Sequence, residues 1–121
     1  MVKSTDTITC DTLDIWARQT GDIDLTVNAN IVLCNTHTTA DVTLHGKSSQ
    51  LGIYHSGEGF LYFEHLQVDF TWTHSVASGD EYLNVYGHLW ATIDWIGNIY
   101  YTGSPAIALK GVGEGQLIHQ N

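Results

Sequence analysis

Apolar and polar residues alternate in short segments of this chain, and similar segments return about every 19 residues, a fixed period of the kind that repeat proteins show. One kind of segment contains two apolar residues separated by a single position. Its first members stand at positions 13, 32, 51, 70, 89 and 107, so the steps are 19, 19, 19, 19 and 18. The pairs are Leu13/Ile15, Val32/Cys34, Leu51/Ile53, Phe70/Trp72, Leu89/Ala91 and Ile107/Leu109. Alternation with a period of two is typical of a β-strand that buries one face.

A second kind of segment begins with a small residue and continues as another alternating strand. The small residues stand at positions 21, 40, 59, 79, 97 and 115, in steps of 19, 19, 20, 18 and 18. A repeat of strand, turn, strand and turn is too short to bury its own apolar face, so successive repeats must stack. The pattern predicts an all-β fold, a parallel β-helix or β-solenoid. It would have about six rungs of roughly 19 residues, with two main strands per rung.

A Greek-key sandwich is the competing all-β interpretation, because it also uses short strands separated by turns. The self-similarity of alternate strands over six cycles favours the solenoid. One irregularity falls between Ser78 and Tyr82, where Glu81 occupies a position that is Ile, Val or Leu in neighbouring repeats. Because an unpaired buried carboxylate is costly, we expect a bulge there that turns Glu81 outward.

Composition narrows the possible functions. The length of 121 residues predicts a single domain, 1–121, and the formal net charge of −9 argues against a nucleic-acid partner. The chain has no apolar run of about 18 residues, the length that a membrane span requires, which argues against membrane insertion by this segment. Polar residues follow Met1–Lys3, so this chain shows no signal peptide.

Three stretches resemble the bacterial head GIN domain family of proposed auto-transporter adhesins. They are SGEGFLYF, ASGDEYLNV and above all GNIYYTGSPAIALKGVGEG, and the resemblance covers roughly residues 13–121. The Ser-Gly-Ser-Gly-Asp signature of that family survives only in degraded form. The resemblance implies a β-helix-like fold, a location outside the cytoplasm at the cell surface or in secretion, and adhesion to a glycan or a surface protein. It brings no catalytic residues. Bactofilins, which are self-associating polymers of short β-helical rungs, are the second resemblance, and they would imply a homo-oligomer.

Aromatic residues provide the candidate binding site. Tyr62, Tyr82 and Tyr100 occupy the third position after the small residue, between two inward positions, so we expect them to form an outward column. Such a column could stack against sugar rings, with Trp90 and Trp95 extending the surface. The alternative is that stacked like residues stabilise the parallel sheet.

Metal and cofactor sites are not predicted. His55 and His74 are one repeat apart in the sequence and could lie on neighbouring rungs, as could Asp22 and Asp41. Neither pair has a third ligand in a matching column, and a metal site needs several convergent ligands. We interpret the histidines as exposed turn residues and the aspartates as solvated corner residues.

An enzymatic function is also not predicted. A β-helical carbohydrate-active enzyme, which is the weakest alternative, needs convergent carboxylates on one face. The acidic candidates Asp69, Asp80, Glu81 and Asp94 do not share a column, and the chain contains no nucleophile motif or phosphate loop.

Overall fold

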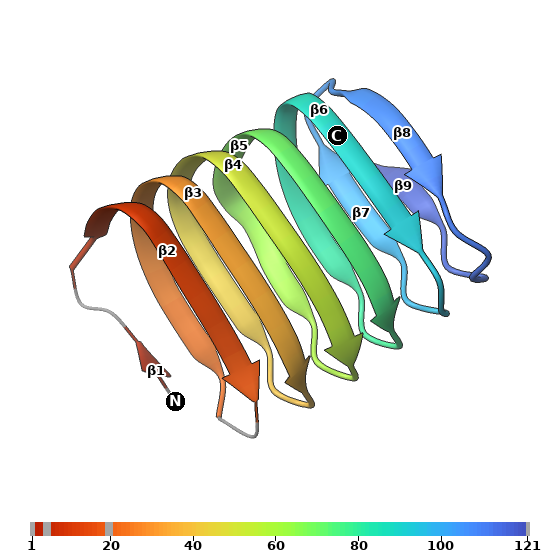
Figure 1. Ribbon diagram of the computed structural model, residues 1–121, viewed down its shortest axis with the longest axis horizontal. Coiled ribbons are helices and arrows are strands. Elements are labelled where there is room, and N and C mark those ends of the chain that lie inside the picture. The colour runs from red at the N-terminus through yellow and green to blue at the C-terminus, as the bar shows by residue number, and fades with distance from the viewer. Residues whose placement is uncertain (1, 4–5, 19–20, 121) are drawn as a thin grey trace.

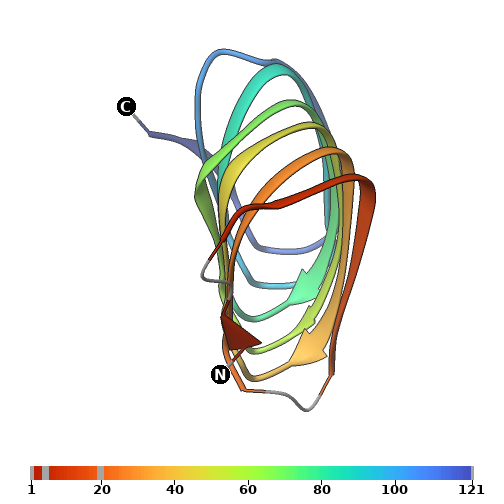
Figure 2. The same cartoon turned by 90° about the vertical axis from the view of Figure 1, so that its left-hand side faces the viewer.

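The computed structural model describes residues 2–3, 6–18 and 21–120, and they form one nine-stranded sheet that is wound into a flattened coil (Figures 1 and 2). Every strand pair is parallel, and no helix occurs among the described residues. The all-β solenoid predicted from the repeat is therefore confirmed. The strands are β1 (Val2–Lys3), β2 (Ile8–Arg18), β3 (Ile23–Thr38), β4 (Val42–Gly57), β5 (Leu61–Ala77), β6 (Glu81–Ile93), β7 (Ile99–Thr102), β8 (Ala106–Lys110) and β9 (Leu117–His119).

Two layers face each other across the core. Each of β3 to β6 is a long bent strand that contributes its first half to one layer and its second half to the other (Figure 1). The back layer contains the first halves together with β7 and β9, and the front layer contains the second halves together with β8 (Figure 1). Figure 2 looks along the coil and shows the two layers side by side.

Side chains that point inward form ladders from rung to rung. The back-layer ladder is Ile23, Val42, Leu61, Glu81, Ile99 and Leu117, and the front-layer ladder is Leu13, Val32, Leu51, Thr71, Leu89 and Ile107. Successive positions in both ladders differ by 19, 19, 20, 18 and 18. The spacing predicted from the small residues is therefore confirmed.

The prediction that Phe70 and Trp72 point inward is wrong. The register between β4 and β5 shifts by one residue opposite Thr43 and His45, so Leu51 pairs with Thr71 rather than with Phe70. A one-residue shift moves every following side chain to the other face of the sheet. Thr71 is consequently buried and Trp72 is exposed. The inserted residue lies within β5, not near Ser78 as the sequence suggested.

Some corners depend on glycine. Gly46 has a φ of 110°, and a Cβ atom there would collide with the carbonyl oxygen of Val27 on the preceding rung. Gly103 repeats this arrangement with a φ of 94° against the carbonyl oxygen of Val85. Both positions combine the left-handed conformation with a close backbone approach, and only glycine accommodates both.

A column of aspartate and asparagine side chains joins one corner of the rungs. Each accepts a hydrogen bond from the backbone N–H of the residue above it, which satisfies an amide in a turn. The bonds are 2.8 or 2.9 Å long. Their backbone donors and side-chain acceptors are Asp41 N–H to Asp22, Phe60 N–H to Asp41, Asn98 N–H to Asp80 and Gln116 N–H to Asn98. The aspartates that we interpreted as merely solvated therefore have a structural role.

Candidate functional site

The three predicted tyrosines form a continuous stack on the outer face of the back layer. The ring centroids of Tyr62 and Tyr82 are 5.4 Å apart with planes 12° apart, and those of Tyr82 and Tyr100 are 5.0 Å apart with planes 11° apart. We call these three residues the tyrosine column. Each ring covers a face of its neighbour, so the column offers ring edges rather than free faces to a ligand.

Burial and nearby carboxylates raise the pKa of two of these phenol groups. Partial burial raises the pKa of Tyr62, and Asp41 adds to the effect. Burial is likewise the main cause of the raised pKa of Tyr82, with Asp80 the next contributor. These hydroxyls therefore remain neutral hydrogen-bonding groups at ordinary pH.

The structure does not bring the five predicted site residues together. Trp90 lies on β6 in the half that pairs with β8, so it faces outward from the front layer, opposite the tyrosine column. Trp95 follows the end of β6 at a corner. Both indoles are 54% exposed. Trp90 and Trp95 therefore do not extend the tyrosine surface, and whether any of the five binds a ligand stays a prediction.

Trp90 instead belongs to a group of aromatic side chains on the outer face of the front layer, which we call the tryptophan face. Its members are Trp16, Tyr54, Phe70, Trp72 and Trp90. They come from strands β2, β4, β5 and β6, so they are distributed along the solenoid axis, with Asn35 of β3 between Trp16 and Tyr54. Exposed apolar areas of this kind mark interaction sites in soluble proteins.

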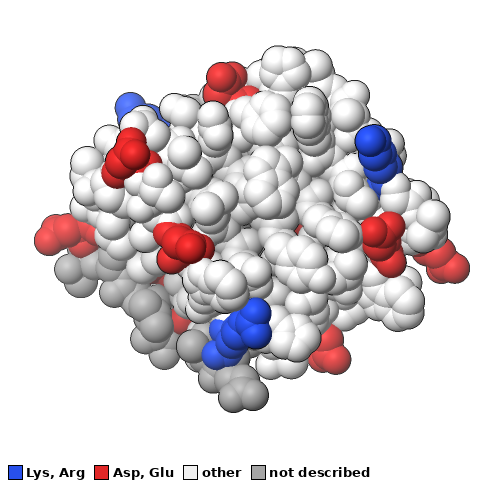
Figure 3. Space-filling view, viewed as in Figure 1, with Lys and Arg blue, Asp and Glu red and all other residues white. Residues whose placement is uncertain are grey.

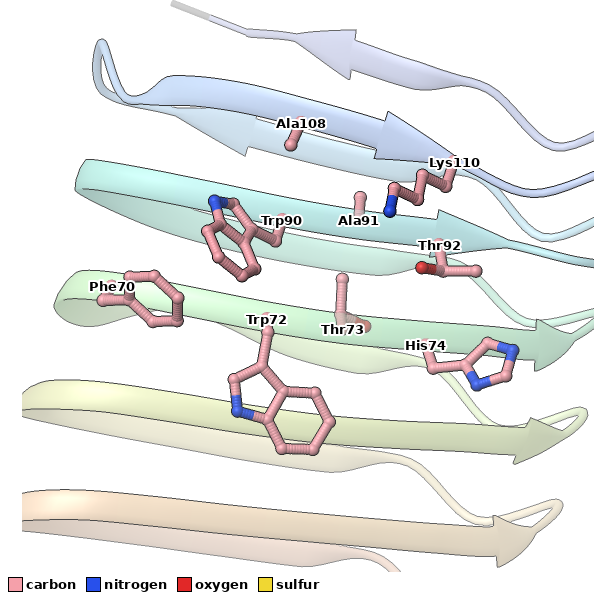
Figure 4. Close-up of a pocket in the computed structure, with 9 residues that line it drawn as sticks. All are labelled: Phe70, Trp72, Thr73, His74, Trp90, Ala91, Thr92, Ala108 and Lys110. Carbon is pink, nitrogen blue, oxygen red and sulfur yellow. The ribbon is translucent and has the colours of Figure 1, made fainter.

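A depression of about 580 Å³ lies on this face (Figure 4). Trp72 and Trp90 form its aromatic walls, and the small side chain of Ala108, which pairs with Trp90, leaves its floor low. Figure 4 shows the indole of Trp90 turned toward Phe70, and their ring centroids are 5.3 Å apart with an edge-on geometry. The ring of Trp90 is thereby held by a packed neighbour.

The indole of Trp72 packs against the sheet in the space where Gly52 has no side chain. It lies across β4 (Figure 4), and a Cβ atom at Gly52 would collide with Cζ2 of the indole and come within 2.6 Å of Cε2. Leu33 on the preceding rung also borders this position. The side chain is nevertheless 44% exposed. One side of the indole therefore rests on the sheet at Gly52 and the other is open to solvent.

Polar groups border the large depression at one end. His74 and Asp94 are joined by a 2.8 Å contact between Nε2 and Oδ2, and Asp94 Oδ1 accepts the N–H of Val112 at 3.1 Å. The hydrogen bond from His74 and the one from Val112 lower the pKa of Asp94. Lys110 also borders the depression and forms no ion pair with any described side chain. Charges are absent from a broad central part of this face (Figure 3).

The core contains an unexpected polar network. Glu81 is fully buried, so the prediction that a bulge turns it outward is wrong. The hydroxyl of Thr73 donates to Oε1 at 2.7 Å, and Nδ1 of His55 lies 3.1 Å from Oε2. Nε2 of His55 lies 2.6 Å from the carbonyl oxygen of Gly59, which can only accept, so this nitrogen carries a proton. Each carboxylate oxygen of Glu81 therefore has one polar partner, which offsets the cost of burying it.

The predicted alignment of His55 with His74 is also wrong. His55 pairs with Ser75, and His74 pairs with Tyr54, because of the extra residue in β5. His55 consequently points into the core and His74 points outward, so His55 is not the exposed turn residue that we expected. In the described part of the chain, no three His, Cys, Asp or Glu side chains gather as a metal site would require.

Sequence reasoning missed Trp72, Phe70 and Trp16 as surface residues. The signal for Trp72 was present, because the small residues already show a step of 20 at this rung where the apolar pairs appeared to keep 19. A single rung cannot advance by two different numbers of residues unless a bulge intervenes. Moving the pair from Phe70/Trp72 to Thr71/Thr73 reconciles the two spacings, although it places threonines in the core.

Comparisons with known proteins agree with this architecture. The family model described as "Putative auto-transporter adhesin, head GIN domain" matches residues 1–105. Among solved structures, "putative adhesins" from Parabacteroides distasonis and Parabacteroides merdae superpose with TM-scores of 0.94 and 0.93 at 19% and 18% identity. A "putative adhesin" from Bacteroides fragilis has a TM-score of 0.93 at 25% identity.

These three matches cover 98%, 99% and 98% of this chain, but only 51%, 51% and 56% of the respective solved chains. The chain thus spans about half the length of the structures that it matches. The search of curated proteins found no match. No helix in the described residues is long and apolar enough to cross a membrane.

Proposed function

The chain belongs to the head GIN domain family, and we propose that it is a non-catalytic module of a cell-surface or secreted adhesin that contacts a glycan through its tryptophan face. The family match and the three solved "putative adhesins" support adhesion and a surface location. Because those solved chains are about twice as long, the proposal concerns the contact made by this segment.

The observation that carries the proposal is the pair of exposed indoles around the large depression. Trp72 is 44% exposed and Trp90 is 54% exposed, and both are held by neighbours rather than free to collapse. The C–H groups on one face of a pyranose ring carry small positive charges, and they are attracted by the negative face of an aromatic ring. Ordered rings reduce the entropy lost on binding.

The sheet geometry favours a glycan over an extended polypeptide at this face. Where they border the depression, β5 and β6 pair on both sides, so their backbone groups are already hydrogen bonded. A peptide that bound there could not add a strand, which is how extended segments usually gain main-chain hydrogen bonds. A sugar needs only ring faces and a few polar side chains, and Thr92 and Lys110 supply these at the border.

The polar groups at the depression also support a non-catalytic function. Glycoside hydrolysis ordinarily uses two opposed carboxyl groups. Asp94 accepts hydrogen bonds from His74, which borders the depression, and from the Val112 amide. Glu81 is fully buried in the core. These two carboxyl groups therefore do not oppose each other across the depression. A β-helical carbohydrate-active enzyme remains the weaker alternative, and turnover of any polysaccharide in a panel would favour it.

A glycan array tests the proposal with two matched aromatic variants. Trp90→Ala should abolish binding, whereas Tyr82→Ala on the opposite layer should leave it unchanged, with circular dichroism confirming that both variants fold. Loss of binding in Tyr82→Ala alone would move the site to the tyrosine column. Wild-type protein that binds no glycan would overturn the proposal.

Self-association is a second candidate, which would resemble the bactofilin mode of assembly. It is favoured by β8, where Ile107 and Leu109 belong to inward ladders but are 43% and 54% exposed. A second copy that covered these side chains would bury apolar area. Light scattering that shows a monomer at high protein concentration would exclude it.

A further inference from the structure

We propose that the tryptophan face binds a linear polysaccharide chain laid along the solenoid axis, across the strands, with Trp72 as its central platform. This inference rests on the proposed function and specifies the class and orientation of the glycan. It follows from the arrangement of two depressions, from the contact between Gly52 and the Trp72 indole and from the spacing of the aromatic residues.

Two depressions share Trp72. The large one, of about 580 Å³, lies on its C-terminal side and includes Trp90. A smaller one, of about 220 Å³, lies on its N-terminal side and includes Trp16 and Tyr54. A ligand confined to either depression would contact only part of the aromatic surface, whereas a chain that crosses Trp72 would contact all of it.

The aromatic residues are distributed along the axis in two neighbouring columns. Trp16 and Tyr54 belong to one column, with Asn35 between them, and Trp72 and Trp90 belong to the column two residues earlier along the strands. Trp16 lies on β2, Tyr54 on β4, Trp72 on β5 and Trp90 on β6. Neighbouring strands are about 4.8 Å apart, so the four rung steps from Trp16 to Trp90 cover roughly 19 Å. A single sugar ring is much shorter than this distance, and a chain of several rings matches it.

Gly52 shows that the platform at Trp72 is built into the sheet. Its backbone is not among the glycines with positive φ, so the chain conformation does not require glycine there. The missing side chain is required by the indole, because a Cβ atom would occupy the space of the six-membered ring. Glycine is otherwise depleted in strands. Glycine at position 52 lets the Trp72 ring lie against the sheet with its other side toward solvent, so the platform is formed before any ligand binds.

Polar side chains alternate with the rings along the track and suit the hydroxyl groups of a sugar chain. Asp14 and Asn35 border the small depression, and Thr92 and Lys110 border the large one. These groups can donate to or accept from hydroxyls on the edges of stacked pyranose rings. An apolar protein partner would instead leave them buried without hydrogen bonds.

Chain length provides the first test. Binding of cellohexaose, chitohexaose and mannohexaose is compared with that of the corresponding disaccharides by calorimetry, using the whole chain. For at least one sugar, the hexamer should bind about tenfold tighter than the dimer, because it reaches further rings. Trp16→Ala should remove most of this advantage.

The outcomes separate the two proposals. Equal affinity for hexamer and dimer would refute the extended chain and would keep the adhesin proposal, since the panel had still found a glycan. Binding of no oligosaccharide in this set, by a protein that does bind glycans on the array, would also refute a linear chain. A protein that binds nothing on the array would refute both.

The contact between Gly52 and the Trp72 indole provides the second test. Gly52→Ala keeps every aromatic residue but displaces the indole of Trp72, so it should weaken hexamer binding about as much as Trp72→Ala does. The double variant Gly52→Ala/Trp72→Ala should bind like Trp72→Ala alone. Thermal unfolding of each variant checks the fold. Full hexamer affinity in a folded Gly52→Ala variant would refute the role of the platform.

Discussion

Replacing Glu81 by leucine tests whether the buried polar network stabilises the solenoid. The other members of this ladder are aliphatic, so a simple hydrophobicity argument predicts that Glu81→Leu is stabilising. The structure predicts the opposite. Leucine would leave the hydroxyl of Thr73 and Nδ1 of His55 without their partner in a region closed to water.

The expected loss can be estimated from the groups left unpaired. Each buried polar group without a hydrogen bond costs about 1–3 kcal/mol, and Glu81→Leu leaves both the Thr73 hydroxyl and Nδ1 of His55 in that state. Leucine recovers part of this through the apolar area that it buries. We therefore expect Glu81→Leu to lower the free energy of unfolding by about 3 kcal/mol, and few single substitutions cost this much.

Urea denaturation followed by far-ultraviolet circular dichroism gives the free energy of unfolding and its dependence on denaturant. Glu81→Gln is the matched control, because its amide group keeps an oxygen that can accept from Thr73 and an N–H that can donate toward Nδ1 of His55. It should stay within about 1 kcal/mol of the wild type. In the double variant Glu81→Leu/Thr73→Val one orphaned hydroxyl is gone, so the two losses should be less than additive. A Glu81→Leu protein as stable as the wild type would refute the reasoning.

Three further predictions concern the corner column, the core and the tyrosine column. Asp41→Ala should lower the free energy of unfolding by about 1–2 kcal/mol because the Phe60 amide loses its acceptor, whereas Asp41→Asn should change it little; urea denaturation decides. Burial raises the pKa of the Cys34 thiol to about 12, so it should resist a thiol reagent at a pH of about 8.5 until the protein unfolds, and rapid labelling of Cys34 in a native Cys10→Ala variant would contradict this. Because burial raises the pKa of folded Tyr82, its contribution to stability is complete below the ordinary tyrosine pKa of about 10 and is lost as pH rises further. Tyr82→Phe should therefore reduce the loss of stability in alkaline solution, with ultraviolet titration of the phenols as the direct measurement.

The repeat was sufficient to predict the fold because it records packing that every rung shares. Ile23, Val42 and Leu61 must fill equivalent positions in one continuous core, so their spacing is visible without a structure. The outward stack of Tyr62 and Tyr82 could be predicted for the same reason, since strand alternation fixes the direction of each side chain.

The candidate site was less accessible to sequence reasoning because it depends on a single departure from the repeat. Phe70 and Trp72 alternate like a core pair, and their size favours burial. Only the register of β5 against β4 turns them outward. The partners of Glu81 were equally hidden, because His55 and Thr73 come from other rungs and the desolvation argument considered the carboxylate alone.

The extra residue in β5 connects the polar core network to the candidate binding face. With a uniform step from rung to rung, Trp72 would lie inside and Thr73 outside. With the one longer step that the structure shows, Thr73 enters the core beside Glu81, and Trp72 emerges over Gly52. A bulge that exposes a large indole must fill the vacated positions with small side chains, and the hydroxyl of Thr73 supplies a hydrogen bond that a buried carboxylate needs. The buried glutamate and the exposed tryptophan are therefore two consequences of one inserted residue. A deletion in β5 that restored the uniform step should disturb both stability and ligand binding, whereas Glu81→Leu should affect stability alone.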